Sequence, residues 1–204
     1  MAQPQPAPAP DAAAERIRRA AVGLFMERGY HGTPVRALAQ VLRMEAGSLY
    51  YHFPSKQQIL VDLLDRILDD LLAGLARAVA GARGPAAKLA AAVRFHVLFH
   101  TRRREEAFIS GSELRSLMAP NLRKINARRD RYERVFRELL QAGTRAGVFE
   151  VTDAKLTAMA ILTMGTGVAS WFSEQGRLPP EAVAERYVEM VMRMVGRGGK
   201  GQRA

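Results

Sequence analysis

The stretch that decides the fold is Thr33–Lys56, which reads TPVRALAQVLRMEAGSLYYHFPSK. Its apolar spacing predicts a short helix over Val35–Leu42, introduced by Thr33-Pro34 as N-cap and first-turn proline. A tight connection at 43–45 leads into a second short helix over Ala46–His52. Two short helices on a tight turn, braced by a longer helix before them, are typical of a helix-turn-helix unit, which reads the major groove of DNA.

Outside this stretch the apolar residues recur with helical spacing, and no segment shows sustained alternation between hairpin turns. The prolines after the N-terminal segment fall at breaks between periodic segments, as they do in helical chains. We therefore expect an all-α fold. The expected helices are Asp11–Arg28, Val35–Leu42, Ala46–His52, Lys56–Ala80, Pro85–His100, Arg102–Met118, Asn121–Ala146, Asp153–Phe172 and Glu181–Val195.

Local signals mark several of these helix ends. Ser55, with Gln58 three residues later, forms the pattern of a capping box. Gly147 has the position of a C-terminal glycine, and Thr152 that of an N-cap. Arg43 occupies the turn between the two short helices, where a positive φ carries a cost for any residue other than glycine.

Composition limits the function classes. The chain has 204 residues, with Lys plus Arg 31, Asp plus Glu 20 and a net charge of +11, so we expect polyanionic partners. There is no Cys, which excludes a disulfide scaffold, thiolate metal sites and a Cys nucleophile. Residues 2–10 carry no secretory pattern. The longest uncharged stretch, 156–173, contains Thr, Ser and Gly, so we expect a buried helix and no membrane contact.

These observations give a domain plan. Residues 1–10 are expected to be a disordered Pro/Ala tail, and 11–54 the helix-turn-helix domain. Residues 55–195 are expected to form a helical domain for ligand binding and dimerisation, followed by a flexible basic tail at 196–204.

One ordered run makes the helix-turn-helix prediction specific. LYYHFPSK, Leu49–Lys56, combines a helix end, a linker and a cap in fixed order, and it follows Gly29-Tyr30 and Thr33-Pro34-Val35. This region, about a quarter of the chain, resembles the DNA-binding domain of TetR-family transcriptional repressors. The resemblance implies a cytoplasmic, nucleoid-associated homodimer of nine-helix subunits that pair through their last two helices. The third helix of each subunit would enter the major groove of operator DNA, and a small ligand would separate the two DNA-binding domains.

The resemblance also assigns DNA-contacting positions. Groove contacts are expected from the start of the third helix and phosphate contacts from its end and from the second helix. Glu45 stands where the family often has Ser or Lys; it either caps the helix or accepts a hydrogen bond from cytosine N4. The expected DNA-binding residues are Thr33, Val35, Arg36, Arg43, Glu45, Ala46, Gly47, Ser48, Tyr50, Tyr51, His52 and Lys56.

Much of the positive charge lies elsewhere, in residues 94–137, where Lys124, Arg128 and Arg131 share one helix face. One interpretation is a solvated surface with intrahelical pairs such as Asp130–Arg134. The other is an anion site: several members of the family that this chain resembles respond to acyl-coenzyme A thioesters, and Arg forks bind phosphate. The expected residues for such a small anionic or amphipathic effector are Phe95, Phe99, Arg102, Arg103, Arg104, Phe108, Arg128, Met164, Trp171 and Phe172.

Dimerisation is expected in the last two helices, which carry small residues and methionines on their surfaces. The expected interface residues are Ala160, Thr163, Gly167, Tyr187, Met190 and Met194.

Other function classes find weaker support. His96 and His100 share a helix face at i, i+4, but no HExxH motif or third ligand of suitable spacing accompanies them. No nucleophile elbow or phosphate loop is present, so we expect no enzyme, no metal and no cofactor. Two rival hypotheses remain, an architectural DNA binder without an effector and a regulator that responds to aromatic cations. The basic residues at 94–137 argue against the second.

Overall fold

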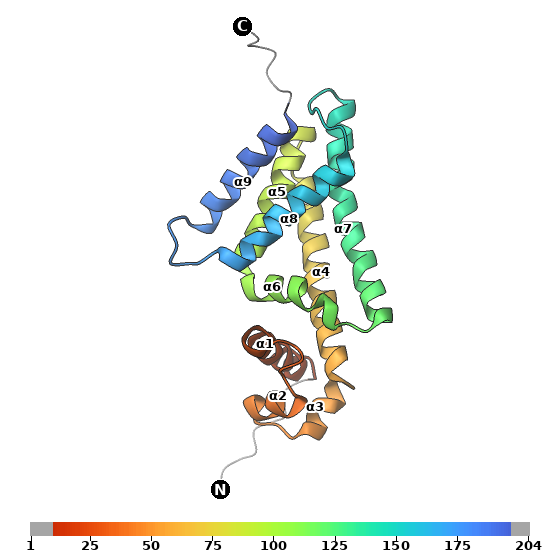
Figure 1. The fold of residues 1–204 in the computed structure, drawn as a ribbon, viewed down its shortest axis with the longest axis vertical. Coiled ribbons are helices and arrows are strands. Elements are labelled where there is room, and N and C mark those ends of the chain that lie inside the picture. Colours follow the sequence, from red (N-terminus) through yellow and green to blue (C-terminus); the bar gives the residue numbers. More distant parts are fainter. Residues whose placement is uncertain (1–9, 197–204) are drawn as a thin grey trace. The chain divides into compact units, whose positions relative to one another are not determined.

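The computed structural model describes residues 10–196, and over this range the chain is all-α, with nine α-helices and one short 3₁₀ helix, η1. The two expected tails, except Pro10 and Gly196, lie outside the described residues. The elements are α1 (Pro10–Arg28), α2 (Val35–Leu42), α3 (Ala46–His52), α4 (Lys56–Ala80), α5 (Pro85–Arg102), α6 (Arg104–Ser112), η1 (Glu113–Ser116), α7 (Ala119–Arg145), α8 (Ala154–Trp171) and α9 (Pro180–Val195) (Figure 1).

The expected helix ends agree with the structure to within two residues, except at the end of the sixth helix, and one expected cap differs. The sixth helix was expected to continue to Met118, but α6 ends at Ser112 and η1 replaces its last turn. The N-cap of α8 is Asp153 and not Thr152, because the Asp153 carboxylate accepts the N–H groups of Lys155 and Leu156, both at 2.9 Å.

Two other end signals are seen in the structure. Ser55 Oγ accepts the N–H of Gln58 at 3.1 Å, which is the Ser55 half of the expected capping box. Gly147, which follows α7, has a φ of 68°, the left-handed conformation that glycine adopts without steric cost.

The chain divides into two compact units, and the division differs from the expected boundary at 54/55. Unit 1 contains the residues up to Arg66 and, in addition, Phe108–Ile125. Unit 2 contains Ile67–Ala107 and the residues from Asn126 onward. The helix-turn-helix region is therefore part of a discontinuous unit that includes the end of α6, η1 and the start of α7.

In unit 1, α1, α2 and α3 pack against one another (Figure 1). Ile17 of α1, Leu38 of α2 and Leu49 of α3 are fully buried between them, so each helix contributes an apolar face to one core. Phe53, which follows α3, is also buried. This core fixes α3 from behind and leaves its opposite face open.

In unit 2, α5 packs against both α8 and α9 (Figure 1). The close approach of α5 to α8 and to α4 depends on one glycine in each of these two neighbours. A Cβ on Gly165 of α8 would lie 2.3 Å from Cδ2 of His96, and a Cβ on Gly74 of α4 would lie 2.2 Å from Cζ of Phe95. Both α5 side chains therefore lie directly against the backbone of a neighbouring helix.

Candidate nucleic-acid interface and effector domain

The turn between α2 and α3 is closed by Arg43 in the left-handed conformation. Its φ is 51°, and it is the one non-glycine residue with positive φ among residues 10–196. The N–H of Arg43 donates to the Gln40 carbonyl at 3.1 Å, and that of Met44 to Ala39 at 2.9 Å. These bonds end α2 and set the direction of α3, at the steric cost that a side chain pays in this conformation.

α3 presents almost its whole surface to solvent. Leu49 is its one buried residue. Ala46, Gly47 and Ser48 form a small, exposed N-terminal end, and a Cβ on Gly47 would meet nothing within 4 Å. Tyr51 is 83% exposed. An exposed helix with small residues at its leading end fits the requirement for entering a major groove.

Two residues that flank α3 keep polar groups available. Glu45 is the N-cap residue, but its carboxylate makes no capping hydrogen bond, so the capping alternative is not the one seen. Arg36, at the start of α2, is exposed and forms no ion pair within the described residues. Tyr50 is exposed and Val35 and His52 are half-buried, so these predicted contact residues border the same surface.

Thr33 is not on this surface. Its side chain is fully buried, and Oγ1 donates to the carbonyls of Gly29 at 2.8 Å and Leu24 at 3.2 Å. The helix cap is Pro34, with no side-chain hydrogen bond. The expected N-cap and phosphate contact of Thr33 are therefore corrected: its hydroxyl fastens the connection after α1.

Lys56 is also engaged by the protein. Its Nζ donates to the carbonyls of Tyr30 at 2.8 Å and Thr33 at 2.9 Å, and it lies 4.2 Å from the centre of the Tyr30 ring. Partial burial lowers the pKa of Lys56. The group expected to contact phosphate thus holds the α1–α2 connection in place.

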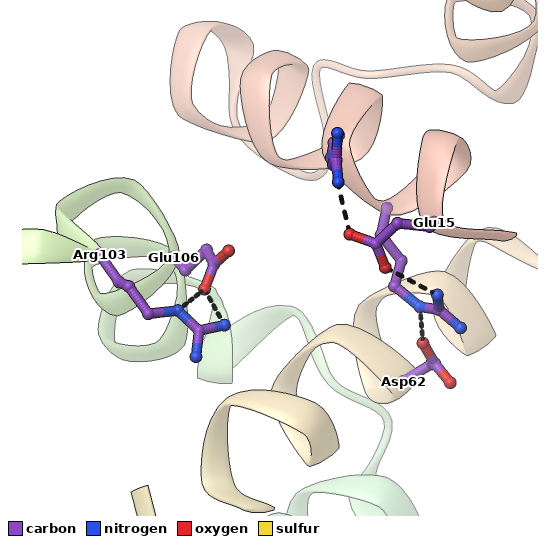
Figure 2. Close-up of polar contacts among 6 residues, drawn as sticks. Glu15, Asp62, Arg103 and Glu106 are labelled. Atoms are coloured by element: carbon purple, nitrogen blue, oxygen red, sulfur yellow. Dashed lines mark hydrogen bonds and ion pairs between the residues drawn. The ribbon is translucent and has the colours of Figure 1, made fainter. Parts of the chain in front are cut away.

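Arg18 and Arg19 of α1 are paired with acids. Arg18 donates to Asp62 of α4 at 2.6 Å and to Glu15 at 3.1 Å, and Arg19 contacts Glu15 at 3.3 Å. Figure 2 shows these carboxylates engaged with the arginines of α1. The ion pairs brace α1 against α4, and they leave Arg36 and Arg43 as exposed cations beside α3.

A buried polar junction joins the α1–α2 connection to η1 and the start of α7, all within unit 1. The Gln57 amide donates to Tyr30 Oη at 3.0 Å and to the Ser116 carbonyl at 3.2 Å, and its oxygen accepts the Met118 N–H at 2.6 Å. The Glu113 carboxylate accepts the Tyr30 N–H at 3.3 Å and the Ser116 hydroxyl at 2.7 Å. Local sequence pattern does not indicate this junction, because its partners are up to 83 residues apart in the chain.

In unit 2, the arginines expected to bind an anion are mostly paired with acids of other helices. Arg103 contacts Asp70 of α4 and Glu106 of α6, the second of which Figure 2 shows. Asp70 lies outside residues 94–137, and Glu106 lies within them beside Arg103. The net positive charge counted over residues 94–137 therefore overstates the positive charge that is free to bind an anion. The remaining partners are Glu181 for Arg102 at 2.7 Å, the Ala169 carbonyl for Arg104 at 3.0 Å, and Asp69 for Arg128.

The aromatic and Met residues expected to line a ligand site are not brought together as one lining. Phe95 is half-buried and Phe99 and Phe172 are buried in unit 2. Phe108 belongs to unit 1. Trp171 is 56% exposed, and Met164 is also exposed on the outer face of α8.

A small hollow of about 290 Å³ lies at the α8–α9 connection. Its lining is mostly apolar with one charged residue. The lining residues are Trp171, Phe172, Ser173, Gly176, Arg177, Leu178 and Val183.

A buried histidine pair lies inside unit 2. His96 Nδ1 lies 3.1 Å from Tyr132 Oη, and its Nε2 lies 3.3 Å from the Leu162 carbonyl. His100 Nδ1 lies 2.8 Å from the His96 carbonyl, and the two rings are 4.2 Å apart. Burial lowers the pKa of both, that of His100 to about 4. No group of three potential metal ligands occurs within residues 10–196.

Exposed apolar side chains gather on α8, and α9 adds two exposed methionines among exposed charged residues. Met159 and Met164 of α8 and Met190 and Met194 of α9 are all exposed. Ala160 and Thr163 are exposed, and Gly167 and Tyr187 are half-buried. No helix within the described residues is both long and apolar enough to cross a membrane.

Comparison with known proteins agrees with this geometry. The family model for "Bacterial regulatory proteins, tetR family" matches residues 17–63, and the model for "Tetracyclin repressor-like, C-terminal domain" matches residues 82–195. The HTH-type transcriptional repressor KstR2 of Rhodococcus jostii (strain RHA1) is 27% identical over 197 residues, covering 92% of this chain and 95% of the relative.

Two solved structures are similar over nearly the whole chain. A bacterial regulatory protein of the tetR family from Rhodococcus RHA1 has a TM-score of 0.87 and 33% identity, covering 92% of this chain and 98% of that one. AibR in complex with isovaleryl coenzyme A and operator DNA has a TM-score of 0.80 and 28% identity, covering 87% and 96%. With family models matching both parts of the chain, the protein belongs to the TetR family of transcriptional regulators, which bind DNA and are not enzymes.

Proposed function

We propose that the protein is a dimeric, cytoplasmic repressor that binds operator DNA through α3 and leaves it when unit 2 binds a small acyl-coenzyme A thioester or a related intermediate of lipid or ring catabolism. The observation that carries the DNA-binding part is α3 itself, a helix with one buried residue and an open N-terminal end. Ala46, Gly47 and Ser48 would approach base edges, and Glu45 would accept from cytosine N4.

Phosphate contacts are assigned to the exposed cations and hydroxyls around α3. Arg36 and Arg43 form no ion pair within the described residues, so each can neutralise a phosphate without first breaking one. Tyr50, Tyr51 and His52 lie at the far end of α3, where backbone contacts are expected. Thr33 and Lys56 support this surface from inside and are not counted among its contacts.

The dimer is proposed to form through the outer faces of α8 and α9. Exposed methionines and small residues on adjoining helices are suited to close helix packing between two copies. We place Met164 and Trp171 with this surface rather than with the effector, because both are exposed on α8. Two-fold pairing would set two α3 helices on successive half-sites of an operator.

The effector class is supported by the similarity to AibR, whose structure contains isovaleryl coenzyme A. The pairing of Arg102, Arg103 and Arg128 with carboxylates means that a phosphate would have to displace an acid to bind there. We therefore expect apolar contacts and individual hydrogen bonds to contribute more to effector selection than this set of arginines.

The test uses the purified full-length chain. Its binding sites are first selected from a pool of genomic DNA fragments and footprinted, and DNA release is then followed by fluorescence anisotropy with isovaleryl-coenzyme A, longer acyl-coenzyme A thioesters, free acids and coenzyme A. Protection of a defined palindrome with release by thioesters is the expected result. Uniform coating of DNA would favour an architectural protein, and release by aromatic cations alone would overturn the proposed effector class.

A further inference from the structure

The inference concerns the hollow at the α8–α9 connection, which comprises residues 172–179 between these two helices. Its volume is about 290 Å³, at the lower end of the range of about 300–1,000 Å³ that pockets for drug-sized ligands span. A coenzyme A thioester, with its nucleotide, pantetheine arm and acyl chain, is too large to enter this space whole. The hollow is therefore suited to a smaller molecule than the proposed effector.

The walls of the hollow are fixed by contacts within the protein. Phe172 is buried, and Trp171 lies against it with 6.5 Å between the ring centres. The N–H of Gly176 donates to the Ser173 carbonyl at 2.9 Å, and the N–H of Gln175 donates to Ser173 Oγ at 3.3 Å. A Cβ on Gly176 would lie 2.9 Å from the Ser173 carbonyl oxygen, so a larger residue would disturb this turn. Because the connection is held by its own hydrogen bonds, binding there costs little conformational entropy.

Most of the lining is apolar, and part of it is aromatic. Trp171 is 56% exposed, so its indole adds open apolar surface to the hollow. Leu178 and Val183 add aliphatic surface. Aromatic rings in contact are stabilised beyond the effect of the area that they bury. The lining therefore favours a ligand that carries a flat ring.

One charged side chain, Arg177, belongs to the lining. It is exposed, and it forms no hydrogen bond or ion pair with any residue of the described range 10–196. Two acids lie close in sequence, and neither pairs with it. Glu174 is exposed and outside the lining, and Glu181 Oε1 accepts Arg102 at 2.7 Å. Since a guanidinium binds a carboxylate through two parallel hydrogen bonds, Arg177 can hold an anionic group without first breaking an ion pair.

We propose that the hollow binds a small aromatic carboxylate, with its ring against Trp171 and its carboxylate on the Arg177 guanidinium. This goes beyond the proposed function, because the ligand is of another class than the thioester effector. Trp171 also belongs to the proposed dimer surface, so the bound ring would lie at the edge of that surface. The alternative occupant is a second copy of the chain that covers the indole.

The experiment uses fluorescence, since Trp171 is the single tryptophan of the chain. The full-length protein is titrated with benzoate, benzamide and acetate while its quenching by acrylamide is recorded. Benzamide keeps the ring and removes the charge, whereas acetate keeps the charge and removes the ring. We expect benzoate to protect Trp171 with saturation, benzamide to bind about tenfold more weakly, and acetate to give no protection.

The variant that tests the charge is Arg177→Gln, which alters an exposed side chain and so should keep the fold. Benzoate should bind this variant about tenfold more weakly than the wild type, with the affinity for benzamide unchanged. Arg145→Gln, at the exposed arginine that ends α7, is the matched control and should bind benzoate as the wild type does.

Three outcomes would overturn the inference. If benzoate left the quenching of Trp171 unchanged, no ligand of this class would bind in the hollow. Equal affinities for benzoate and benzamide, or an equal loss in the two arginine variants, would exclude the Arg177 contact. Protection that appears when the ligand-free protein is concentrated, with no further effect of benzoate, would show that a second copy occupies this place.

Discussion

At the scale of single residues, Lys56 separates two roles that the sequence alone cannot distinguish. Its Nζ is bonded to the carbonyls of Tyr30 and Thr33, so its contribution to DNA binding is to hold the α1–α2 connection. We expect Lys56→Met to weaken operator binding about tenfold while the slope of log K against log salt stays unchanged, because no phosphate contact is removed.

The matched comparison is Arg36→Met, on the exposed surface beside α3. Loss of a phosphate contact there should reduce the salt slope by about one unit. The measurement is fluorescence anisotropy of operator binding over a range of salt concentrations. If the slope of log K against log salt fell by the same amount in both variants, Lys56 would be a phosphate contact, as expected from the sequence.

His100 gives the protein a predictable response to acid. Its pKa in the folded state is about 4, below the ordinary value of 6.5, so the unfolded chain binds the proton first as the pH falls. The stabilisation is complete above about pH 6.5 and is lost between about pH 6.5 and pH 4, with a contribution on the order of 3 kcal/mol. The pKa of His96 is shifted in the same direction by burial.

Urea unfolding at about pH 7 and about pH 5 tests this expectation. The loss of unfolding free energy on acidification should be smaller in His100→Leu than in the wild type, and unchanged in His31→Gln, where the substituted side chain is exposed. An equal loss in the wild type and His100→Leu would show that carboxylates, not this histidine, cause the acid sensitivity.

At the scale of elements, α3 should tolerate changes on its surface without loss of stability. Tyr51 is exposed and its ring touches only the neighbouring His52 among the ring contacts of the described residues. We expect Tyr51→Ala to change the unfolding free energy by less than about 0.5 kcal/mol and to weaken operator binding about tenfold or more.

Met118→Ala is the control, since Met118 is an exposed side chain of unit 1 outside α3. It should affect neither quantity. Anisotropy and urea unfolding on the same preparations separate the two effects. If Tyr51→Ala bound the operator as the wild type does, the assignment of the far end of α3 to DNA contacts would be wrong.

The proposed contact between two copies of the chain includes Gly167 of α8. A Cβ on Gly167 meets nothing within 4 Å in the subunit, so a larger side chain there is sterically free until a second copy approaches. We expect Gly167→Leu to keep the fold and weaken the dimer by a factor of ten or more, and Gly167→Ala to have a smaller effect. Sedimentation velocity over a dilution series measures this; identical profiles for Gly167→Leu and the wild type would exclude this face.

The elements themselves were largely predictable. The bounds of α2, α3 and α4 follow from their apolar spacing and from Pro and Ser signals at their ends. The end of α6 was not predictable, because residues 113–116 continue the helical pattern of the sequence, whereas in the structure they form the 3₁₀ helix η1. There Glu113 and Ser116 are buried polar residues that bond to each other, a tertiary arrangement that periodicity does not encode.

Site residues were predictable only as far as exposure follows from local pattern. The exposed face of α3 was predictable, since Leu49 is the one buried residue of this helix. The burial of Thr33 was not predictable from local pattern. Neither was the pairing of Arg128 with Asp69, which lies 59 residues away in the sequence. A sum of charges over a stretch of sequence omits the acidic partners that folding brings to that stretch from elsewhere in the chain.

At the scale of the whole molecule, the DNA-binding unit depends on a segment that the chain reaches only after α5. Gln57 bonds to Tyr30 on one side and to Ser116 and Met118 on the other, so its amide joins the two parts of unit 1. Removing the amide leaves the Met118 N–H and the Ser116 carbonyl without this partner. We expect Gln57→Leu to lower the unfolding free energy by about 2–3 kcal/mol, because buried polar groups would be left unpaired.

The neighbouring Gln58→Leu is the control for this junction, since Gln58 has an exposed side chain on the same helix turn. Urea unfolding and operator binding of both variants, measured on the full-length chain, separate stability from function. Because the junction fixes the connection that leads into α2, Gln57→Leu should also weaken operator binding at unchanged salt slope, as Lys56→Met does. Wild-type stability in Gln57→Leu would mean that Phe108–Ile125 is held to the helix-turn-helix by apolar contacts alone, and the polar junction would then contribute only to its geometry.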